Sequence, residues 1–414
     1  MQSYLILGLG LITSCAGECS RIVERREIRE LSTSEVNDFV SALSKLHEEK
    51  WEGISKYEKF TKTHVDNKQY SHFSPQFLPW HRHFIRKLEM ELQRINPDVV
   101  LPYWDWSLDS QEPHNSPIMS SEYMGGNGDP ANDYCVKDGP FSNWHMDYPT
   151  PHCLRRDYDE GTKMSVFSTP EAISVNLNVP KFSDFSLQLE IKHGAPHVNI
   201  GGDKGDIFPM HSPNDPIFFL HHTFIDMLWA EWQARHPDSV YEGERYRTTG
   251  TADDIMHPFN STVASTLDTY SDFYCYTYPR YPRQIIPKAA PPGLRSLIAN
   301  LARRNPFMGH RRTRITQANV DRSLPGLMHK ASEFAPYLDI SGLKIKALQK
   351  RKPLPAAFIK MNNINPEEAS KSLSEENSII DRLNSFRSFV SLSQSQSLLN
   401  SFYKSHLVSR HFNK

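Results

Sequence analysis

The sequence predicts a mainly α-helical domain with long functional loops, followed by a C-terminal extension. Apolar residues recur at steps of three and four in several segments of the first part of the chain, which is the spacing of one face of a helix. After Pro291-Pro292 the composition changes, and a basic region that is interrupted by Pro and Gly begins. The helical pattern defines the fold class, and the change of composition separates the extension from it.

The net charge of −1 conceals two segments of opposite charge. From Ala289 onward there are 20 Lys and Arg against 8 Asp and Glu, a local charge of +12. That leaves 27 against 40 for residues 1–288, a local charge of −13. The balance gives no support for nucleic-acid binding. We therefore expect an acidic domain over residues 18–288 and a basic extension over residues 289–414.

Residues 1–17 are predicted to be a signal peptide. The apolar run at residues 4–12 is too short to span a bilayer, and the small residues Ser14 to Gly17 suit cleavage. A positively charged start is missing, so a buried N-terminal strand is the alternative. No later stretch is long and apolar enough for a membrane anchor, and we expect a secreted protein.

Four of the five cysteines would remain after this cleavage, an even number that suits two disulfides in an oxidising compartment. Four cysteines allow three connectivities. We favour Cys135–Cys153, which closes a local loop, and Cys19–Cys275, which joins the two ends of the acidic domain. Four unrelated thiols are the alternative. A glycosylation sequon at Asn260 agrees with secretion.

Four helices are expected in the acidic domain, over residues 34–50, from Pro79 to residue 95, from about residue 193 onward, and over residues 215–235. Ser34 is a suitable N-cap, and Pro79 suits a first helical position. Residues 107–165 are rich in Gly, Pro, Asn, Asp and Ser, and a loop of this length usually carries function. Residues 366–390 of the extension could form a further helix.

Two sets of histidines have metal-ligand spacing: His64, His72 and His81 in the first, and His193, His197 and the pair His221-His222 in the second. The four-residue step from His193 to His197 places two imidazoles on one helical face. Pro196 between them is tolerable if the helix begins at His193, because first-turn N–H groups lack helical partners. Asp226 could accept a ring N–H from a neighbouring His and fix its orientation.

Ligation by imidazole alone favours zinc, copper, iron or nickel over magnesium or calcium. A single three-His site could hold zinc. Two separate three-His sets without carboxylate or thiolate fit a pair of copper ions better. The alternative for each His taken alone is a hydrogen bond in the core or a place on the surface.

The chain resembles the tyrosinase, catechol oxidase and molluscan haemocyanin family of type-3 copper proteins. The resemblance covers residues 30 to 280 and is carried by YEKFTKTH (57–64), HFSPQFLPWHRHF (72–84), LPYWDW (101–106), FSLQLE (185–190), HGAPHVNIGG (193–202), SPNDPIFFLHHTFIDMLWAEWQ (212–233) and YCYTY (274–278). It implies a four-helix bundle with long loops enclosing a binuclear copper site. Matched residue by residue, the ligands are His64, His72 and His81 for the first copper (CuA) and His193, His197 and His222 for the second (CuB).

This resemblance also implies the chemistry, in which O2 binds between two copper ions and small phenols are oxidised to o-quinones. In the family, hydroxylation of monophenols is linked to a water held by a Glu and an Asn beside the first CuB ligand. Glu190 matches that Glu, but Gly194 stands where the Asn would be. We therefore expect oxidation of o-diphenols or o-aminophenols, with weaker hydroxylation of monophenols. Tyr70 stands where some members carry a Cys, so no thioether to His72 is expected.

The basic extension lies outside the resemblance, and related enzymes often carry extensions that cover the site until they are cleaved. Its charge favours docking on the acidic domain, although salt screens such attraction. A disordered, solvated tail is the alternative. Candidate processing points are Arg303-Arg304, Arg311-Arg312 and Lys350-Arg351-Lys352.

Three other functions remain open at this stage. A full tyrosinase would also hydroxylate monophenols efficiently. A haemocyanin-like O2 carrier is disfavoured by the single copy of the motif, and a matrix protein with a vestigial site is disfavoured by the six intact ligands.

Overall fold

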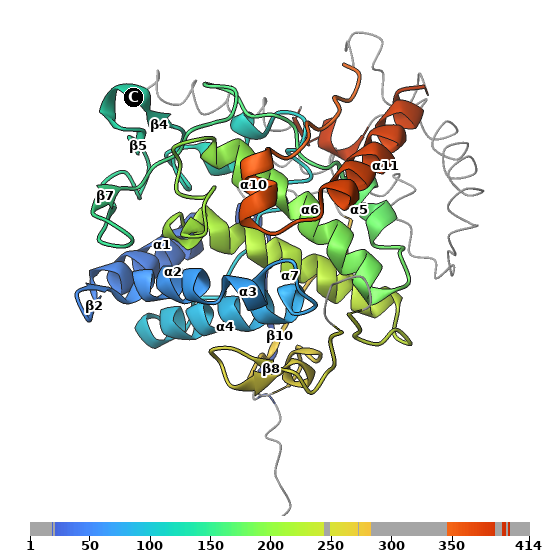
Figure 1. The fold of residues 1–414 in the computed structure, drawn as a ribbon. Helices are drawn as coiled ribbons and strands as arrows, with labels where there is room; N and C mark the ends of the chain where they lie inside the picture. The colour runs from blue at the N-terminus through green and yellow to red at the C-terminus, as the bar shows by residue number, and fades with distance from the viewer. Residues whose placement is uncertain are drawn as a thin grey trace, which may run out of the picture.

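The computed structural model describes residue 19 and residues 21–243, 249–271, 273–282, 346–385, 391–394 and 396–397. It is mainly helical and has a helix-bundle core, as predicted (Figure 1). The helices are α1 (Thr33–Glu48), α2 (Lys56–Asp66), α3 (Lys68–Ser71), α4 (Phe77–Ile95), α5 (Pro170–Asn176), α6 (Phe182–Gly201), α7 (Ile217–Arg235), α10 (Ala356–Met361) and α11 (Pro366–Ser385). The predicted signal peptide and the predicted boundary between residues 288 and 289 lie outside the described residues.

Short strands tie the loops together in two-stranded sheets. The strands are β1 (Val23–Glu24), β2 (Lys50–Trp51), β3 (Ile54–Ser55), β4 (Gly128–Asp129), β5 (Cys135–Val136), β6 (His145–Met146), β7 (His152–Cys153), β8 (Ile255–Met256), β9 (Ser261–Thr262) and β10 (Tyr276–Thr277). Most pair with the next strand in the chain, but β1 pairs in parallel with β10. The two ends of the acidic domain therefore lie side by side.

Capping boxes start the first two helices. Ser32 caps α1 and exchanges hydrogen bonds with Glu35, so the predicted cap at Ser34 is wrong and this residue lies in the first turn. Ser55 and Glu58 form the same motif at α2. The sequence analysis did not predict α2 as a helix, although this S-x-x-E signal preceded it.

Two of the helices that carry histidines, α4 and α6, begin earlier than predicted, and α7 begins two residues later. α4 starts at Phe77, so Pro79 lies within its first turn. α6 starts at Phe182, and the predicted start at His193 is wrong. Pro196 thus sits inside the helix, where a proline costs about 3 kcal/mol. Almost every residue of α6 is buried, and this tertiary packing offsets the local cost.

The long segment at residues 107–165 has little regular structure, as predicted: three short 3₁₀ turns and the hairpins β4–β5 and β6–β7. Both predicted disulfides are present. Cys135–Cys153 crosslinks β5 to β7, and Cys19–Cys275 joins the N-terminal segment to the chain before β10. Among the described residues, no helix has both the length and the apolar character that crossing a membrane requires.

A buried ion network clamps α4 to α7. Arg82 of α4 donates from Nε to Asp226 of α7 at 2.5 Å, and Tyr276 and Tyr278 donate their hydroxyls to the same carboxylate at 2.6 and 2.7 Å. Arg25, after β1, reaches Asp226 at 3.3 Å. Burial alone would raise the pKa of Asp226, but the two guanidinium groups lower it below its usual value. One carboxylate therefore joins two helices and both ends of the domain.

We expect Asp226→Ala to lower the free energy of unfolding by about 3–5 kcal/mol, because Arg82 would be left buried without its carboxylate. Urea denaturation of the copper-free protein measures this change. The exposed i,i+4 pair Lys62–Asp66 provides the control. Asp66→Ala should change the stability by about 0.5 kcal/mol or less. Equal losses in the two variants would contradict the prediction.

Candidate metal centre

The six predicted ligands come from separate parts of the helix bundle but meet in the core. His64 lies in the last turn of α2, His72 follows α3 directly, and His81 lies in α4. The second set comes from α6 (His193 and His197) and α7 (His222). All six side chains are buried. In each set the ring nitrogens that could bind an ion lie within 4.8 Å of one another. The sets are adjacent, since the rings of His81 and His222 stack at 4.2 Å.

Backbone carbonyls fix the protonation of one ring nitrogen in four of these histidines. The pairs are His64 Nδ1 with Met210 O (2.7 Å), His81 Nδ1 with Phe77 O (2.9 Å), His193 Nδ1 with Glu190 O (2.7 Å) and His197 Nδ1 with Ile207 O (2.6 Å). A carbonyl only accepts, so each Nδ1 carries the proton and each Nε2 keeps its lone pair. These four Nε2 atoms are buried and have no hydrogen-bond partner among the described residues. They are arranged as metal ligands are.

The two remaining ligands are held less strongly. His72 Nδ1 lies 2.9 Å from the hydroxyl of Ser71. His222 has no hydrogen bond at either ring nitrogen within the part of the chain that the structure describes. A buried imidazole with two unsatisfied nitrogens is costly unless an ion or another group completes it. His222 therefore fits a ligand position well.

His221 lies in the second group together with the three predicted ligands, although the family pattern did not make it a ligand. Trp106 donates its indole N–H to His221 Nδ1 at 3.0 Å. With Nδ1 accepting, the proton of the neutral ring is on Nε2, which then has no lone pair for a metal. This hydrogen bond favours His222 over its neighbour as the third CuB ligand. Trp106 belongs to the LPYWDW motif, but its partner could not be read from the sequence.

The six imidazoles are kept neutral by their surroundings. Burial lowers the pKa of His64 to about 3 and that of His197 to about 4. Burial, together with the neighbouring histidines, places the pKa values of the other four well below the usual value: His72, His81, His193 and His222. Six neutral nitrogen donors without carboxylate or thiolate suit a binuclear type-3 copper site.

The predicted role of Asp226 is wrong. It was expected to accept a ring N–H from a histidine, but its oxygens are bonded to Arg82, Arg25, Tyr276 and Tyr278. The i,i+4 spacing from His222 brings Asp226 to the same side of α7. However, the guanidinium of Arg82, on the facing helix α4, binds the carboxylate instead. Asp226 holds the scaffold and does not orient a ligand.

Glu190 and Gly194 both lie beside His193 on α6, where the sequence placed them. Glu190 is buried, and its carboxylate accepts the backbone N–H of Phe73, the residue after His72. Gly194 faces the extension. A Cβ on Gly194 would lie 2.8 Å from Phe358 Cε1 and 3.2 Å from the methyl groups of Leu354. The space next to the first CuB ligand is thus filled by side chains from the C-terminal extension.

The extension packs on α6 through an apolar cluster. Phe358, Ile364 and Ala369 contact the face of α6 that carries Leu187, Ile191 and Val198. The ring of Phe358 lies 6.2 Å from that of His197. In Figure 1, α10 and α11 (red) lie over α6, on the side away from α4. Docking was predicted from the opposite charges of the two segments, whereas the contact of Phe358 was not predicted, because its one signal was an apolar residue in a basic region.

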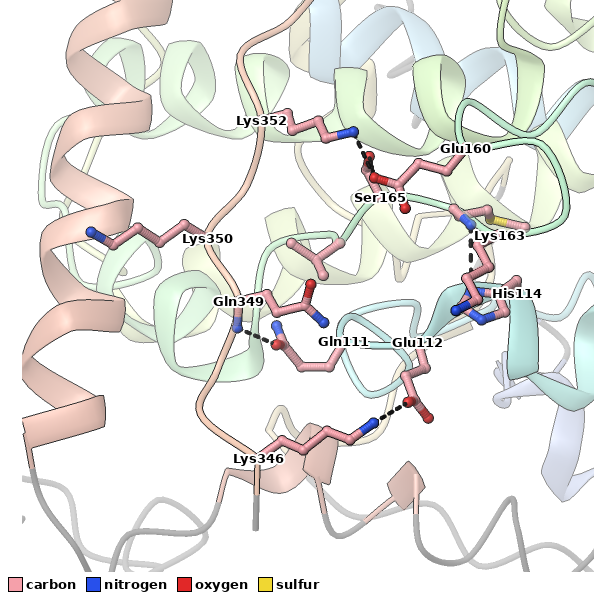
Figure 2. A pocket seen from close by; sticks show the side chains of 12 residues that line it. Gln111, Glu112, His114, Glu160, Lys163, Ser165, Lys346, Gln349, Lys350 and Lys352 are labelled. Carbon is pink, nitrogen blue, oxygen red and sulfur yellow. Dashed lines mark hydrogen bonds and ion pairs between the residues drawn. The ribbon is translucent and has the colours of Figure 1, made fainter. Parts of the chain in front are cut away.

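Charged contacts flank this cluster. Glu376 of α11 is buried between Lys192 of α6, at 3.5 Å, and Arg351, at 3.1 Å. A polar cavity of about 210 Å³ lies beside the segment before α10. At its edge Lys352 pairs with Glu160 (Figure 2). None of the six histidines lines this cavity. At the candidate processing point Lys350-Arg351-Lys352, Arg351 is buried and its two neighbours are exposed.

Comparison with known proteins agrees with this geometry. Residues 54–235 match the family profile described as the common central domain of tyrosinase. The chain is 32% identical over 309 residues to grixazone synthase of Streptomyces griseus, covering 59% of this chain and 96% of that protein. It is 32% identical over 279 residues to a tyrosinase of Streptomyces antibioticus, covering 61% and 98%. Among solved structures, a polyphenol oxidase from Thermothelomyces thermophila has a similar fold, with a TM-score of 0.51 at 21% identity over 63% of this chain and 89% of that one.

Exchanging His221 and His222 separately for Asn tests which of them is a ligand. His222→Asn should reduce the bound copper from about two ions per chain to about one. His221→Asn should keep both ions, because the amide oxygen can accept the Trp106 N–H in place of Nδ1. Metal analysis of the purified proteins gives the answer. The opposite pattern of copper loss would assign the ligand to His221.

Proposed function

Because the chain belongs to the tyrosinase family of type-3 copper phenol oxidases, we propose that it oxidises o-diphenols or o-aminophenols in preference to monophenols. The observation that carries this preference is Gly194, which directly follows the first CuB ligand. A side chain at this position would border any phenol that approaches the copper pair beside His193. Glycine offers no hydrogen-bonding group there.

Deprotonation distinguishes the two substrate classes. A phenol must lose its hydroxyl proton before the oxygen can bind a metal as a phenolate. A catechol or an o-aminophenol is already activated by its second donor group, whereas a monophenol depends more on a base in the site. Glu190 is the carboxylate next to His193, but its oxygen accepts the backbone N–H of Phe73. Without an amide at residue 194, a water held between the two residues lacks one of its partners.

The protein contributes position and electrostatics to the reaction. When bound, the two copper ions supply the electron transfer from the phenol to O2. Two o-diphenols release four electrons and four protons, which convert one O2 into two waters. The neutral imidazoles leave the positive charge of the metal pair uncompensated, and this charge favours binding of a phenolate. Burial of the site excludes bulk water from the reactive o-quinone as it forms.

We further propose that the extension is a lid over this site. Phe358 and Leu354 fill the space above Gly194, and Phe358 stands beside the CuB ligand His197. A phenol entering along this side of α6 would have to displace them. The apolar cluster and the buried Lys192–Glu376 pair keep the lid closed in the full-length chain.

Secretion is part of the same proposal. Two disulfides and a glycosylation sequon suit an oxidising compartment. Residues 1–17 would serve as the signal peptide. A lid that is removed after export would keep the oxidase inactive inside the cell, where phenols and O2 are both present.

Phe358→Ala should raise kcat/KM for catechol at least about tenfold, because it opens the space above Gly194 and costs the lid about 3–5 kcal/mol of apolar packing. Oxygen uptake by the copper-loaded, full-length protein measures it. Leu46→Ala is the control and should leave the rate unchanged, since Leu46 is also fully buried but lies in α1, outside the extension. Unchanged rates after both Phe358→Ala and limited proteolysis of the extension would contradict the lid.

The substrate preference is tested by comparing turnover of tyrosine, catechol and o-aminophenol. With Phe358→Ala as background, we expect o-aminophenol and catechol to react at least about tenfold faster than tyrosine, a difference of about 1.4 kcal/mol in the barrier. Adding Gly194→Asn should raise the tyrosine rate relative to catechol. Gly194→Ala fills the same space without an amide and should not. Equal rates on tyrosine and catechol before any change at residue 194 would refute the preference.

A further inference from the structure

One short loop, residues 205–211, orients a ligand of each copper. Ile207 accepts the Nδ1–H of the CuB ligand His197 at 2.6 Å, and Met210 accepts that of the CuA ligand His64 at 2.7 Å. Ile207 is fully buried. The two carbonyls are three residues apart, so any shift of the loop moves both hydrogen bonds.

The other fixed ligands are not arranged in this way. His81 and His193 donate to carbonyls of their own helices, at Phe77 and Glu190. Helix geometry holds those acceptors in place. For His64 and His197, the acceptor position depends on what anchors a loop outside regular secondary structure.

Asp206 is this anchor. Its side chain is buried, and its Oδ2 accepts the backbone N–H of Arg155 at 2.7 Å. The backbone N–H of Asp206 in turn donates a hydrogen bond to the carbonyl of Arg155 at 3.0 Å. Its Oδ1 accepts from His152 Nε2 at 2.7 Å, and His211 Nε2 lies 3.5 Å from the same oxygen. The residue is adjacent to Ile207, so the carboxylate fixes the loop at its start.

The geometry of His152 makes the contact an ion pair. Its Nδ1 faces the carbonyl of Thr150 and its Nε2 faces the carboxylate of Asp206, and both of these groups only accept. Both ring nitrogens must therefore carry protons. Burial opposes the charged ring, but the hydrogen bond to Asp206 and its charge outweigh this and raise the pKa of His152. His152 precedes Cys153, whose disulfide to Cys135 holds β7.

We propose that Asp206, paired with His152, is a positioning residue for both copper ions. It touches neither metal ligand and acts through the carbonyls of Ile207 and Met210. Partners that orient metal-ligating histidines typically contribute 10–100-fold to metal affinity. Losing this anchor should weaken both copper sites together, whereas a change in a ligand weakens its own site first.

Copper release to a chelator tests this inference. Asp206→Asn keeps the shape of the side chain but removes its charge, and we expect both ions to leave at least about tenfold faster than from the wild type. His152→Leu should have the same effect while leaving the Arg155 bond in place. His152→Gln can still donate from its amide to Asp206 and should restore most of the retention. The melting temperature of the copper-free protein is recorded for each variant.

The control is Asp109→Asn, which removes the charge of another buried carboxylate, bonded to Arg29 at 3.0 Å. It should lower the melting temperature without faster copper release. The inference is overturned if Asp109→Asn releases copper as fast as Asp206→Asn, or if His152→Gln behaves like His152→Leu. Loss of one ion only, with the other retained normally, would also overturn it. His152→Leu and His152→Gln keep the test decisive if Asp206→Asn does not fold.

Discussion

The constraint on which this structure depends is that six imidazoles are buried together and each must present a nitrogen with a free lone pair. Burial alone makes them neutral, but neutrality leaves the position of the remaining proton open. Backbone carbonyls settle it for four of the six, by accepting the Nδ1–H and leaving Nε2 for the metal. At His221 a donor, Trp106, occupies Nδ1 and gives the opposite result. A buried histidine thus presents a free Nε2 where its Nδ1 faces a hydrogen-bond acceptor, and a protonated Nε2 where its Nδ1 faces a donor.

The scaffold holds these rings at fixed separations. The buried Arg82–Asp226 pair joins α4, which carries His81, to α7, which carries His222. The rings of these two histidines stack at 4.2 Å, so the helices cannot slide without disturbing both histidine clusters. A buried ion pair is costly to form from solvated charges, and its value here lies in fixing one register of the two helices. Outside the bundle, the buried ion pair His152–Asp206 holds the loop at 205–211 in a similar way.

The extension packs against α6 at Gly194. A glycine beside the first CuB ligand leaves room, and in the full-length chain that room is filled by Phe358 and Leu354. The missing side chain therefore has two consequences: it removes a hydrogen-bonding group from the site, and it lets the extension approach α6 closely. The extension docks on α6 mainly through apolar contacts. The opposite charges of the two segments contribute a few ion pairs, such as Lys352–Glu160.

The sequence by itself determined the helical class and the histidine sets, because these follow from spacing along the chain and from residue type. Among three possible disulfide connectivities it only favoured the one that the structure contains. It missed the start of α6 and the role of Asp226, because buried packing tolerates Pro196 and a facing Arg82 takes the carboxylate. Only the tertiary structure decided the tautomers, the hydrogen bond from Trp106 to His221, and the contact of Phe358 with Gly194. Most of these depend on a partner outside the residue's own helix, such as Trp106, which is 115 residues from His221. The tautomers of His81 and His193 are the exceptions, because their acceptors lie four and three residues away in the same helix. Local patterns carry no record of such partners, because folding alone brings them together.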